Sequence, residues 1–269
     1  MKWLQSSSQA YAHWAGRHAF LATLAPFALL VVLWQVVVWM GVFPRVFLPG
    51  PADVLARAGD LVYKGILTGY LSDSLIRLAV GTTAGVIVAI PLGVLIGLNR
   101  TAHWLCWPIL LFFQAIGDIA WLPILLVWFG FGLETITFVL VYTVLFPVTM
   151  NTVLGVRSVP EQLLRAARSL GASRVRVLFE VILPGALPNI MTGLRNGLAF
   201  GWRALIAAEI IVGTSGIGFL MFDARRAGSV EPILVGLVVL GVLWYLVDGW
   251  ILAPIERLTG QRWGLVTQD

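Results

Sequence analysis

The sequence is poor in charge. Only 12% of its 269 residues are Asp, Glu, Lys or Arg, whereas 59% are apolar. A water-soluble domain carries roughly a quarter charged residues, so most of this chain must face something other than water. The net charge of +5 does not call for nucleic acid, because basic residues between apolar runs are explained by orientation in a bilayer.

Other scarcities exclude further classes of function. A single cysteine, Cys106, rules out a disulfide framework within the chain. Lys2 and Lys64 are the only lysines, so there is no GxxxxGK[ST] loop to cradle nucleotide phosphates. The three histidines are scattered and make no metal site, and no nucleophile–base pair stands out. A membrane-embedded enzyme would need such converging groups and is therefore disfavoured.

Long apolar runs, in contrast, are abundant. A membrane helix needs roughly 20 apolar residues, and six stretches qualify: 20–40, 78–98, 104–128, 135–154, 191–212 and 232–252. The first is too long for the core of a signal peptide and has no small-residue cleavage site after it, so we expect it to be retained. The sequence predicts an all-α integral membrane protein with six transmembrane helices.

The connections predict the orientation of these helices. With the N-terminus in the cytoplasm, the inside pieces hold ten basic residues and the outside pieces hold five. An excess of Lys and Arg marks the cytoplasmic side, so both termini are predicted to be cytoplasmic. The inside pieces are the N-terminal segment 1–19, residues 99–103, residues 155–190 and the end of the chain, whose tail is 255–269.

The predicted outside segment, 41–74, is long and precedes a membrane core over 75–254. After Leu48-Pro49-Gly50-Pro51, the run from Ala52 to about Val62 has apolar residues at helical spacing: Val54, Leu55, Ala58 and Val62. This pattern is typical of an amphipathic helix lying on the outer membrane surface. A plain connecting helix fits it equally well.

The second span carries a stripe of small residues at every fourth position: Gly81, Gly85, Ala89, Gly93 and Gly97. Small side chains let two helix backbones approach closely in lipid, where no hydrophobic drive brings them together. We expect tight helix packing here, against a helix of the same subunit or of a second copy.

The cytoplasmic segment 156–190 is predicted to contain two short helices. Ser158-Val159-Pro160-Glu161 has the spacing of a capping box, and the helix it begins would stop at Gly171 in a left-handed cap. Ser173 can cap a second helix, which Pro184 would end. The apolar face of the first helix comprises Leu163, Ala167 and Leu170, and that of the second Val175, Leu178, Phe179 and Ile182. Helices this short are unstable alone in water, so a partner must hold them.

These residues resemble a known family. The pattern Ala166-Ala167…Gly171-Ala172…Phe179…Val181…Leu183-Pro184…Pro188 is similar to the EAA motif of ABC importer permeases. Further segments resemble the nitrate/sulfonate/taurine/bicarbonate branch of that family: Ala120-Trp121-Leu122-Pro123, Trp128-Phe129-Gly130-Phe131-Gly132, Ala208-Glu209, Gly216-Ile217-Gly218-Phe219 and Glu256-Arg257…Trp263. The resemblance runs from about residue 45 to residue 264.

The resemblance implies a type I ABC importer transmembrane domain in the bacterial inner membrane. Such a subunit binds no nucleotide; ATP and Mg would be used by two copies of a separate ATPase subunit. A periplasmic binding protein would deliver the solute, and a second permease copy would complete a homodimer. Arg165 stands where the motif has Glu. The residues implied in ATPase coupling are Glu161, Leu164, Arg165, Ala166, Ala167, Leu170, Gly171, Ala172 and Arg174.

Polar groups inside the spans are candidates for the substrate pathway, because ionisable residues in lipid usually face a cavity or a partner. The candidates are Gln114, Asp118, Trp121, Trp202, Arg203 and Glu209. Asp118 could instead cap a helix that restarts at Ile119, and Glu209 could instead form a structural ion pair. Trp121 would act as a steric gate. Arg195 is expected to reach the cytoplasmic interface, and Asp248 to be structural.

The expected function is therefore import of a small anionic or zwitterionic solute. A carboxylate at position 118 would repel a simple anion, which favours a zwitterion such as taurine over nitrate or bicarbonate. A neutral or heterocyclic nutrient is the alternative within the same branch. A channel or secondary transporter would explain six spans but not the two-helix cytoplasmic insert.

Overall fold

A computed structural model describes residues 19–252 and residue 254, so the predicted terminal segments 1–19 and 255–269 lie outside it except for residue 19. The described chain is helical, without strands. Its helices are α2 (Ala19–Trp39), α3 (Pro51–Tyr63), α4 (Ile66–Leu98), α5 (Arg100–Ala115), η1 (Asp118–Trp121), α6 (Leu122–Phe129), α7 (Leu133–Ser158), α8 (Glu161–Ser169), α9 (Arg174–Val177), η2 (Leu178–Ile182), α10 (Leu183–Val212), α11 (Ile217–Arg226), α12 (Glu231–Val247) and η3 (Asp248–Leu252).

Several of these helices are suited to lipid. Within the described residues, four runs are long and apolar enough to cross a membrane: Ile66–Leu98, Leu133–Ser158, Arg174–Val212 and Glu231–Trp250. The bent pair α5 and α6 makes a fifth if it is one span. α2 enters only as a shorter apolar helix over Ala25–Trp39. The all-helical membrane class is confirmed, and the arrangement of six spans stays a prediction.

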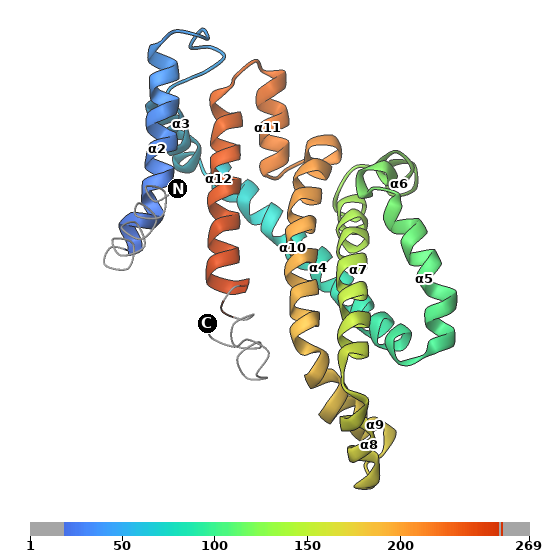
Figure 1. Ribbon diagram of the computed structural model, residues 1–269. Helices are drawn as coiled ribbons and strands as arrows, with labels where there is room; N and C mark the ends of the chain where they lie inside the picture. Colours follow the sequence, from blue (N-terminus) through green and yellow to red (C-terminus); the bar gives the residue numbers. More distant parts are fainter. Residues whose placement is uncertain (1–18, 253, 255–269) are drawn as a thin grey trace.

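α7 is the central helix of the bundle and packs most extensively against α4 and α10 (Figure 1). The predicted stripe of small residues lies on the α4 side of this contact. A Cβ on Gly93 would lie 2.6 Å from the Thr152 Cβ, and one on Gly97 would lie 2.8 Å from Val156. The stripe therefore faces α7 of the same chain.

A second small-residue stripe, not recognised in the sequence, lies on α10. Added Cβ atoms on Gly193, Gly197 and Gly201 would come within 2.7–3.3 Å of Asn151, Val148 and Val144 on α7. These glycines have the same four-residue spacing as the α4 stripe, so the signal was present. α4 and α10 thus both contact α7 through faces lined with glycine, which places the three helix backbones close together.

α3 forms over the stretch where a helix was predicted, and its contacts fit the connecting helix better than the helix on the membrane surface. Its buried residues are Val54 and Leu61, whereas Leu55 is 73% exposed. α3 packs on α12 and α4, so protein rather than a lipid surface covers its buried face. α4 follows almost at once, from Ile66, and therefore begins well before the predicted span.

The predicted span 104–128 is broken into two helices, as expected if a helix restarts at Ile119. α5 ends at Ala115, and the chain turns by 82° before η1 and α6. The carbonyls freed by this break have a partner, because the Tyr142 hydroxyl donates to the carbonyls of Phe113 and Ile116. A broken helix at membrane depth is tolerated where neighbouring groups satisfy the backbone in this way.

Candidate functional site

The segment between α7 and α10 forms a helical hairpin that projects from one end of the molecule (Figure 1). α8 closes with two reverse hydrogen bonds: Gly171 N–H donates to the Arg168 carbonyl at 2.9 Å, and Ala172 N–H donates to the Ala167 carbonyl at 3.1 Å. This is the Schellman arrangement. Gly171 has φ 82°, a left-handed backbone that disfavours a side chain, so α8 ends where the sequence predicted.

The helix starts at Glu161, close to the predicted start near Pro160, but the predicted capping box does not form. Ser158 is the last residue of α7, and its hydroxyl donates to the Gly155 carbonyl at 2.8 Å. The N-cap of α8 is Pro160, which forms no side-chain cap. A serine hydroxyl can bond back to its own helix as readily as it caps the next one, so the motif was ambiguous.

The second helix of the hairpin does not end at Pro184. Ser173 caps it as predicted, but α9, η2 and α10 then continue as one run over 174–212. In η2, Leu183 N–H donates to the Leu178 carbonyl five residues back. This wider π register leaves room for the proline ring and does not need the N–H that proline lacks.

The hairpin packs some of its apolar residues inside and presents others outside. Leu164, Ala167 and Ala172 pack against a cluster around Val177 and Ile182. In contrast, Leu170 is 88% exposed, and Leu163 and Phe179 are also exposed. The predicted apolar face of α8 is therefore split, with Ala167 directed inward and both leucines outward.

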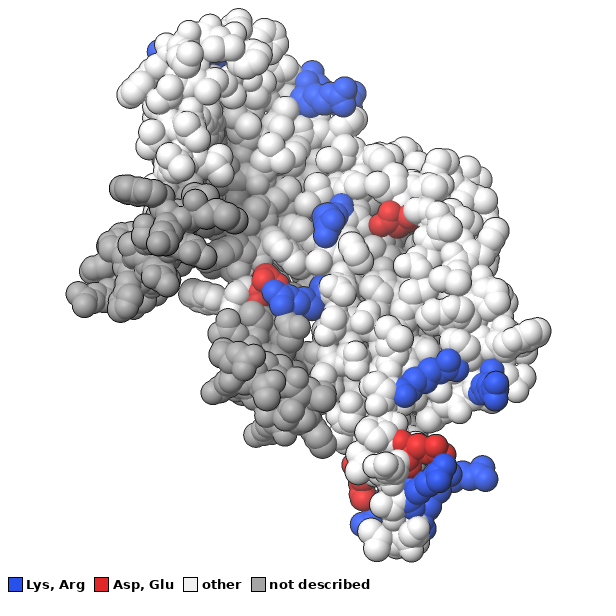
Figure 2. Space-filling model, viewed as in Figure 1, with Lys and Arg blue, Asp and Glu red and all other residues white. Residues whose placement is uncertain are grey.

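Charge accompanies these exposed leucines. Arg165 pairs with Glu161 at 2.9 Å, and Arg176 pairs with Glu180 at 2.9 Å, each one helical turn apart and exposed. Such pairs contribute little to stability. Figure 2 shows blue and red atoms gathered at the end of the molecule where Figure 1 places α8 and α9, while the middle of this face is mostly white. The hairpin is a mixed apolar and charged surface suited to a protein partner.

A cavity of about 300 Å³ lies at the break between α5 and η1. Asp118 begins η1, and its carboxylate accepts from Ile119 N–H at 2.9 Å and from the Thr143 hydroxyl at 2.8 Å. The N-cap of η1 is Gly117, without a side-chain cap, so Asp118 is not the predicted cap; it lies at the helix restart and lines the cavity. The lining residues are Gln114, Ile116, Gly117, Asp118, Ile119, Tyr142, Thr143, Phe146, Pro147, Phe200, Arg203 and Ala204.

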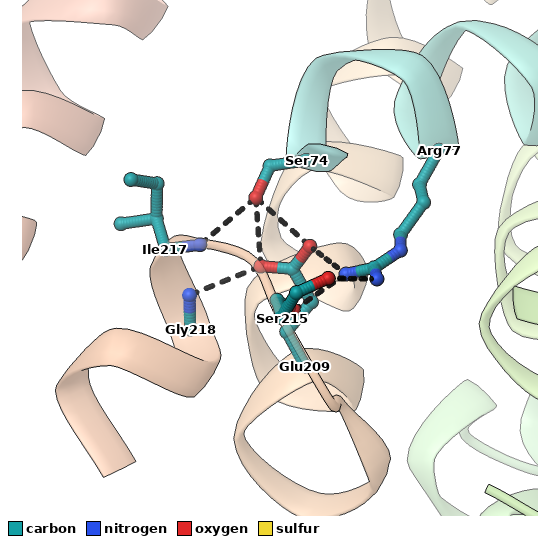
Figure 3. A network of polar contacts seen from close by, with 6 residues as sticks. All are labelled: Ser74, Arg77, Glu209, Ser215, Ile217 and Gly218. Carbon is teal, nitrogen blue, oxygen red and sulfur yellow. Dashed lines mark hydrogen bonds and ion pairs between the residues drawn. The ribbon is translucent and has the colours of Figure 1, made fainter. Parts of the chain in front are cut away.

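Glu209 is not part of this cavity. Its side chain is 1% exposed and forms an ion pair with Arg77 at 3.0 Å (Figure 3). The Ser74 hydroxyl donates to the same carboxylate at 2.8 Å, and Gly218 N–H donates to it at 3.0 Å. Of the two roles considered for Glu209, the geometry is that of a buried structural ion pair, because its lone pairs are occupied by donors of the protein itself.

The network around Glu209 fixes the turn between α10 and α11. Arg77 donates to the carbonyl and to the hydroxyl of Ser215, both at 2.6 Å, while Ser74 accepts from Ile217 N–H at 3.0 Å (Figure 3). The first N–H groups of α11, which have no intrahelical acceptor, are thereby satisfied from α4 and α10. Gly216, with φ 107°, lies so close to the Glu209 carboxylate that a Cβ would overlap it.

Comparison with known proteins decides the family. Residues 82–258 match the family model of the binding-protein-dependent transport system inner membrane component. The chain belongs to this family. It is an ABC importer permease of the nitrate/sulfonate/taurine/bicarbonate branch, a transport subunit rather than an enzyme.

The relatives and a structural neighbour agree. The permease is 38% identical over 243 residues to the taurine transport system permease protein TauC of Escherichia coli, covering 88% of each chain. It is 33% identical over 240 residues to the nitrate import permease protein NrtB of Synechocystis, covering 86% of each. An inward-facing structure of the MetNI methionine ABC transporter matches with a TM-score of 0.64 at 21% identity, over 73% of this chain and 97% of that one.

The other aromatic pathway candidates of the permease, Trp121 and Trp202, are not among the residues that line the cavity. Trp202 is buried and packs against Trp244, and Trp121 packs against Tyr142. Arg195 does not simply reach the interface, since it forms an ion pair with Asp248 at 2.9 Å. Of the predicted pathway residues, the structure brings together Gln114, Asp118 and Arg203 in one cavity.

Sequence reasoning missed the polar partners of Glu209. Ser74 and Arg77 come just before the second apolar run, 78–98, where a charged residue is not unusual. Their three-residue spacing does place them on one helix face, and that was the available signal. Nothing local connects them to an acid more than 130 positions away.

Proposed function

We propose that this permease is the membrane-spanning subunit of an ATP-driven importer in the bacterial inner membrane, with six spans and both termini in the cytoplasm. A periplasmic binding protein delivers a small anionic or zwitterionic solute. ATP and Mg are used by two copies of a separate ATPase subunit, and this chain binds neither. A second copy of the permease completes the assembly as a homodimer.

The observation that carries this proposal is the projecting hairpin of α8 and α9. Leu163 and Leu170 are exposed together with Arg165, so nothing among residues 19–252 covers this apolar surface. A surface of this kind at the end of a bundle is suited to a docking partner. The proposal assigns the hairpin to the ATPase subunit, with Glu161, Leu164, Ala166, Gly171, Ala172 and Arg174 forming or shaping the contact.

The named substrates of the relatives support the solute class. Taurine is a zwitterion and nitrate is an anion, and the permeases named for them are 38% and 33% identical to this chain. They favour a small charged solute over a neutral heterocyclic nutrient. Between taurine and nitrate, taurine or a related sulfonate is preferred, because Asp118 lines the cavity at the helix break.

Reconstitution tests the proposal. The permease, its ATPase and its binding protein in liposomes should take up labelled taurine when ATP is supplied on the ATPase side, with nitrate and bicarbonate tested in parallel. Uptake that proceeds without ATP would make the chain a channel or a secondary transporter. A variant ATPase that cannot hydrolyse ATP is the matched control and should give background uptake.

The stoichiometry has a separate test. Native mass measurement of the purified complex should show two permease copies and two ATPase copies. A complex with one copy of this chain, one copy of a different permease and two ATPases would refute the homodimer while leaving the import function intact.

A further inference from the structure

The cavity at the break between α5 and η1 holds two opposite charges that do not meet. Asp118 and Arg203 both line it, yet no ion pair joins them within the part of the chain that the structure describes. Both residues lie in segments apolar enough to cross a membrane. Charges at such depth are costly and usually face a partner or a water-filled path, so a complementary charge is expected between them.

Each charge is held in place but keeps bonding capacity. The two oxygens of Asp118 each accept one hydrogen bond, from Ile119 N–H and from the Thr143 hydroxyl, and a carboxylate can accept more. The Arg203 guanidinium lies 5.2 Å from the Phe200 ring centre, and its Nε donates to the Ala199 carbonyl at 3.3 Å. Its two terminal nitrogens have no acceptor among residues 19–252.

The pair of charges defines a ligand chemistry. A guanidinium presents a planar set of donors that suits an oxyanion, whereas a carboxylate with free acceptor sites suits an ammonium group. About 300 Å³ is at the lower end of the range for small-molecule sites. Gln114, which also lines the cavity, adds an amide that can bond either group.

We propose that this cavity is a selectivity site within the permease itself, which binds a small zwitterion with its amine at Asp118 and its sulfonate or carboxylate at Arg203. The proposal rests on the proposed import function and narrows its substrate class. A simple anion would meet Arg203 but would also be repelled by Asp118. The cavity thus adds a second filter after the binding protein has chosen the solute.

Direct binding tests the site without the binding protein. The permease–ATPase complex in lipid nanodiscs is titrated with radiolabelled taurine, and ethanesulfonate, which lacks the amine, serves as competitor. We expect wild type to prefer taurine at least tenfold. Asp118→Asn should weaken taurine binding at least tenfold and remove the preference, and Arg203→Gln should weaken both ligands. Asp118→Glu, which keeps the charge, should keep the preference for taurine.

The matched control is Arg226→Gln. Arg226 lies over a phenylalanine ring, as Arg203 does, but is not among the residues that line the cavity; binding should stay within twofold of wild type. Equal affinities for taurine and ethanesulfonate in wild type, no binding of taurine, or equal losses of both ligands in Asp118→Asn would overturn the site. ATP-driven uptake by the wild-type importer, measured after the same purified complex is reconstituted into liposomes with its binding protein, separates this failure from failure of the import function.

Discussion

The Glu209 carboxylate lies in a position where a lone charge would be strongly unfavourable. It is 1% exposed, and its partners are a guanidinium and a hydroxyl from α4 and a backbone N–H from α11. Removing one member of a buried ion pair is far more damaging than replacing both, because the survivor stays buried without its partner. At the residue scale, Arg77 and Glu209 therefore act as one unit.

Arg77→Met should destabilise the purified permease by about 3–5 kcal/mol, which a lowered melting temperature in detergent would show. The doubly substituted Arg77→Met, Glu209→Gln protein should recover a large part of this loss, since no net charge then remains in the site. A double variant that melts below the single one would contradict the assignment of the pair as the main reason for the loss.

Gly171 is the second residue at which a single substitution should have a clear effect. An added Cβ would have nothing within 4 Å, so the cost of a side chain comes from the left-handed backbone alone, about 1–2 kcal/mol. Gly171→Val should loosen the end of α8 and weaken ATPase binding in a pull-down at equal membrane expression. Gly171→Asn is the matched control, because Asn tolerates this backbone conformation and should bind nearly as wild type. If Gly171→Val and Gly171→Asn bound the ATPase equally well, the end of α8 would not contribute to ATPase coupling.

At the scale of elements, the two glycine faces against α7 set the distance between three helices. Gly93→Ala should be destabilising by about 1–3 kcal/mol, because its methyl group would lie 2.6 Å from the Thr152 Cβ and 2.9 Å from the Thr149 carbonyl. Gly69→Ala is the control on the same helix. Its Cβ would have nothing within 4 Å, and alanine favours the helix by about 0.5–1 kcal/mol. Melting temperatures that shift in the same direction for both variants would sink this account.

What could be predicted from the sequence depended on how local the signal was. The cap at Gly171 and the stripe on α4 involve neighbours within one or two turns, and both patterns were recognised. The continuation past Pro184 was not, because proline normally ends a helix and nothing in the sequence marks the π turn over Leu178–Ile182 that precedes it. The Arg77–Glu209 pair and the Asp118–Thr143 contact join helices far apart in sequence, and no periodicity reveals them.

At the scale of the whole molecule, the predicted orientation places α8 and α3 on opposite sides of the membrane. The chain has one cysteine, so Cys106→Ala gives a clean background for labelling. Tyr63→Cys, at a position 91% exposed, should react with a membrane-impermeant maleimide in intact cells. Leu170→Cys should react only after the inner membrane is opened. Leu237→Cys, on the apolar surface of α12, is the control and should stay unlabelled in both conditions.

The continuous run from Arg174 to Val212 joins the hairpin to the Glu209 network without a break. Its 39 residues span about 58 Å at 1.5 Å per residue, and Gly193, Gly197 and Gly201 hold its middle against α7. A rigid helix held at its middle can tilt about the point where it is held. Under the proposed coupling, a displacement of the end at Arg174 by the ATPase would move the end at Val212 in the opposite direction. The turn that Glu209 fixes would move with that end.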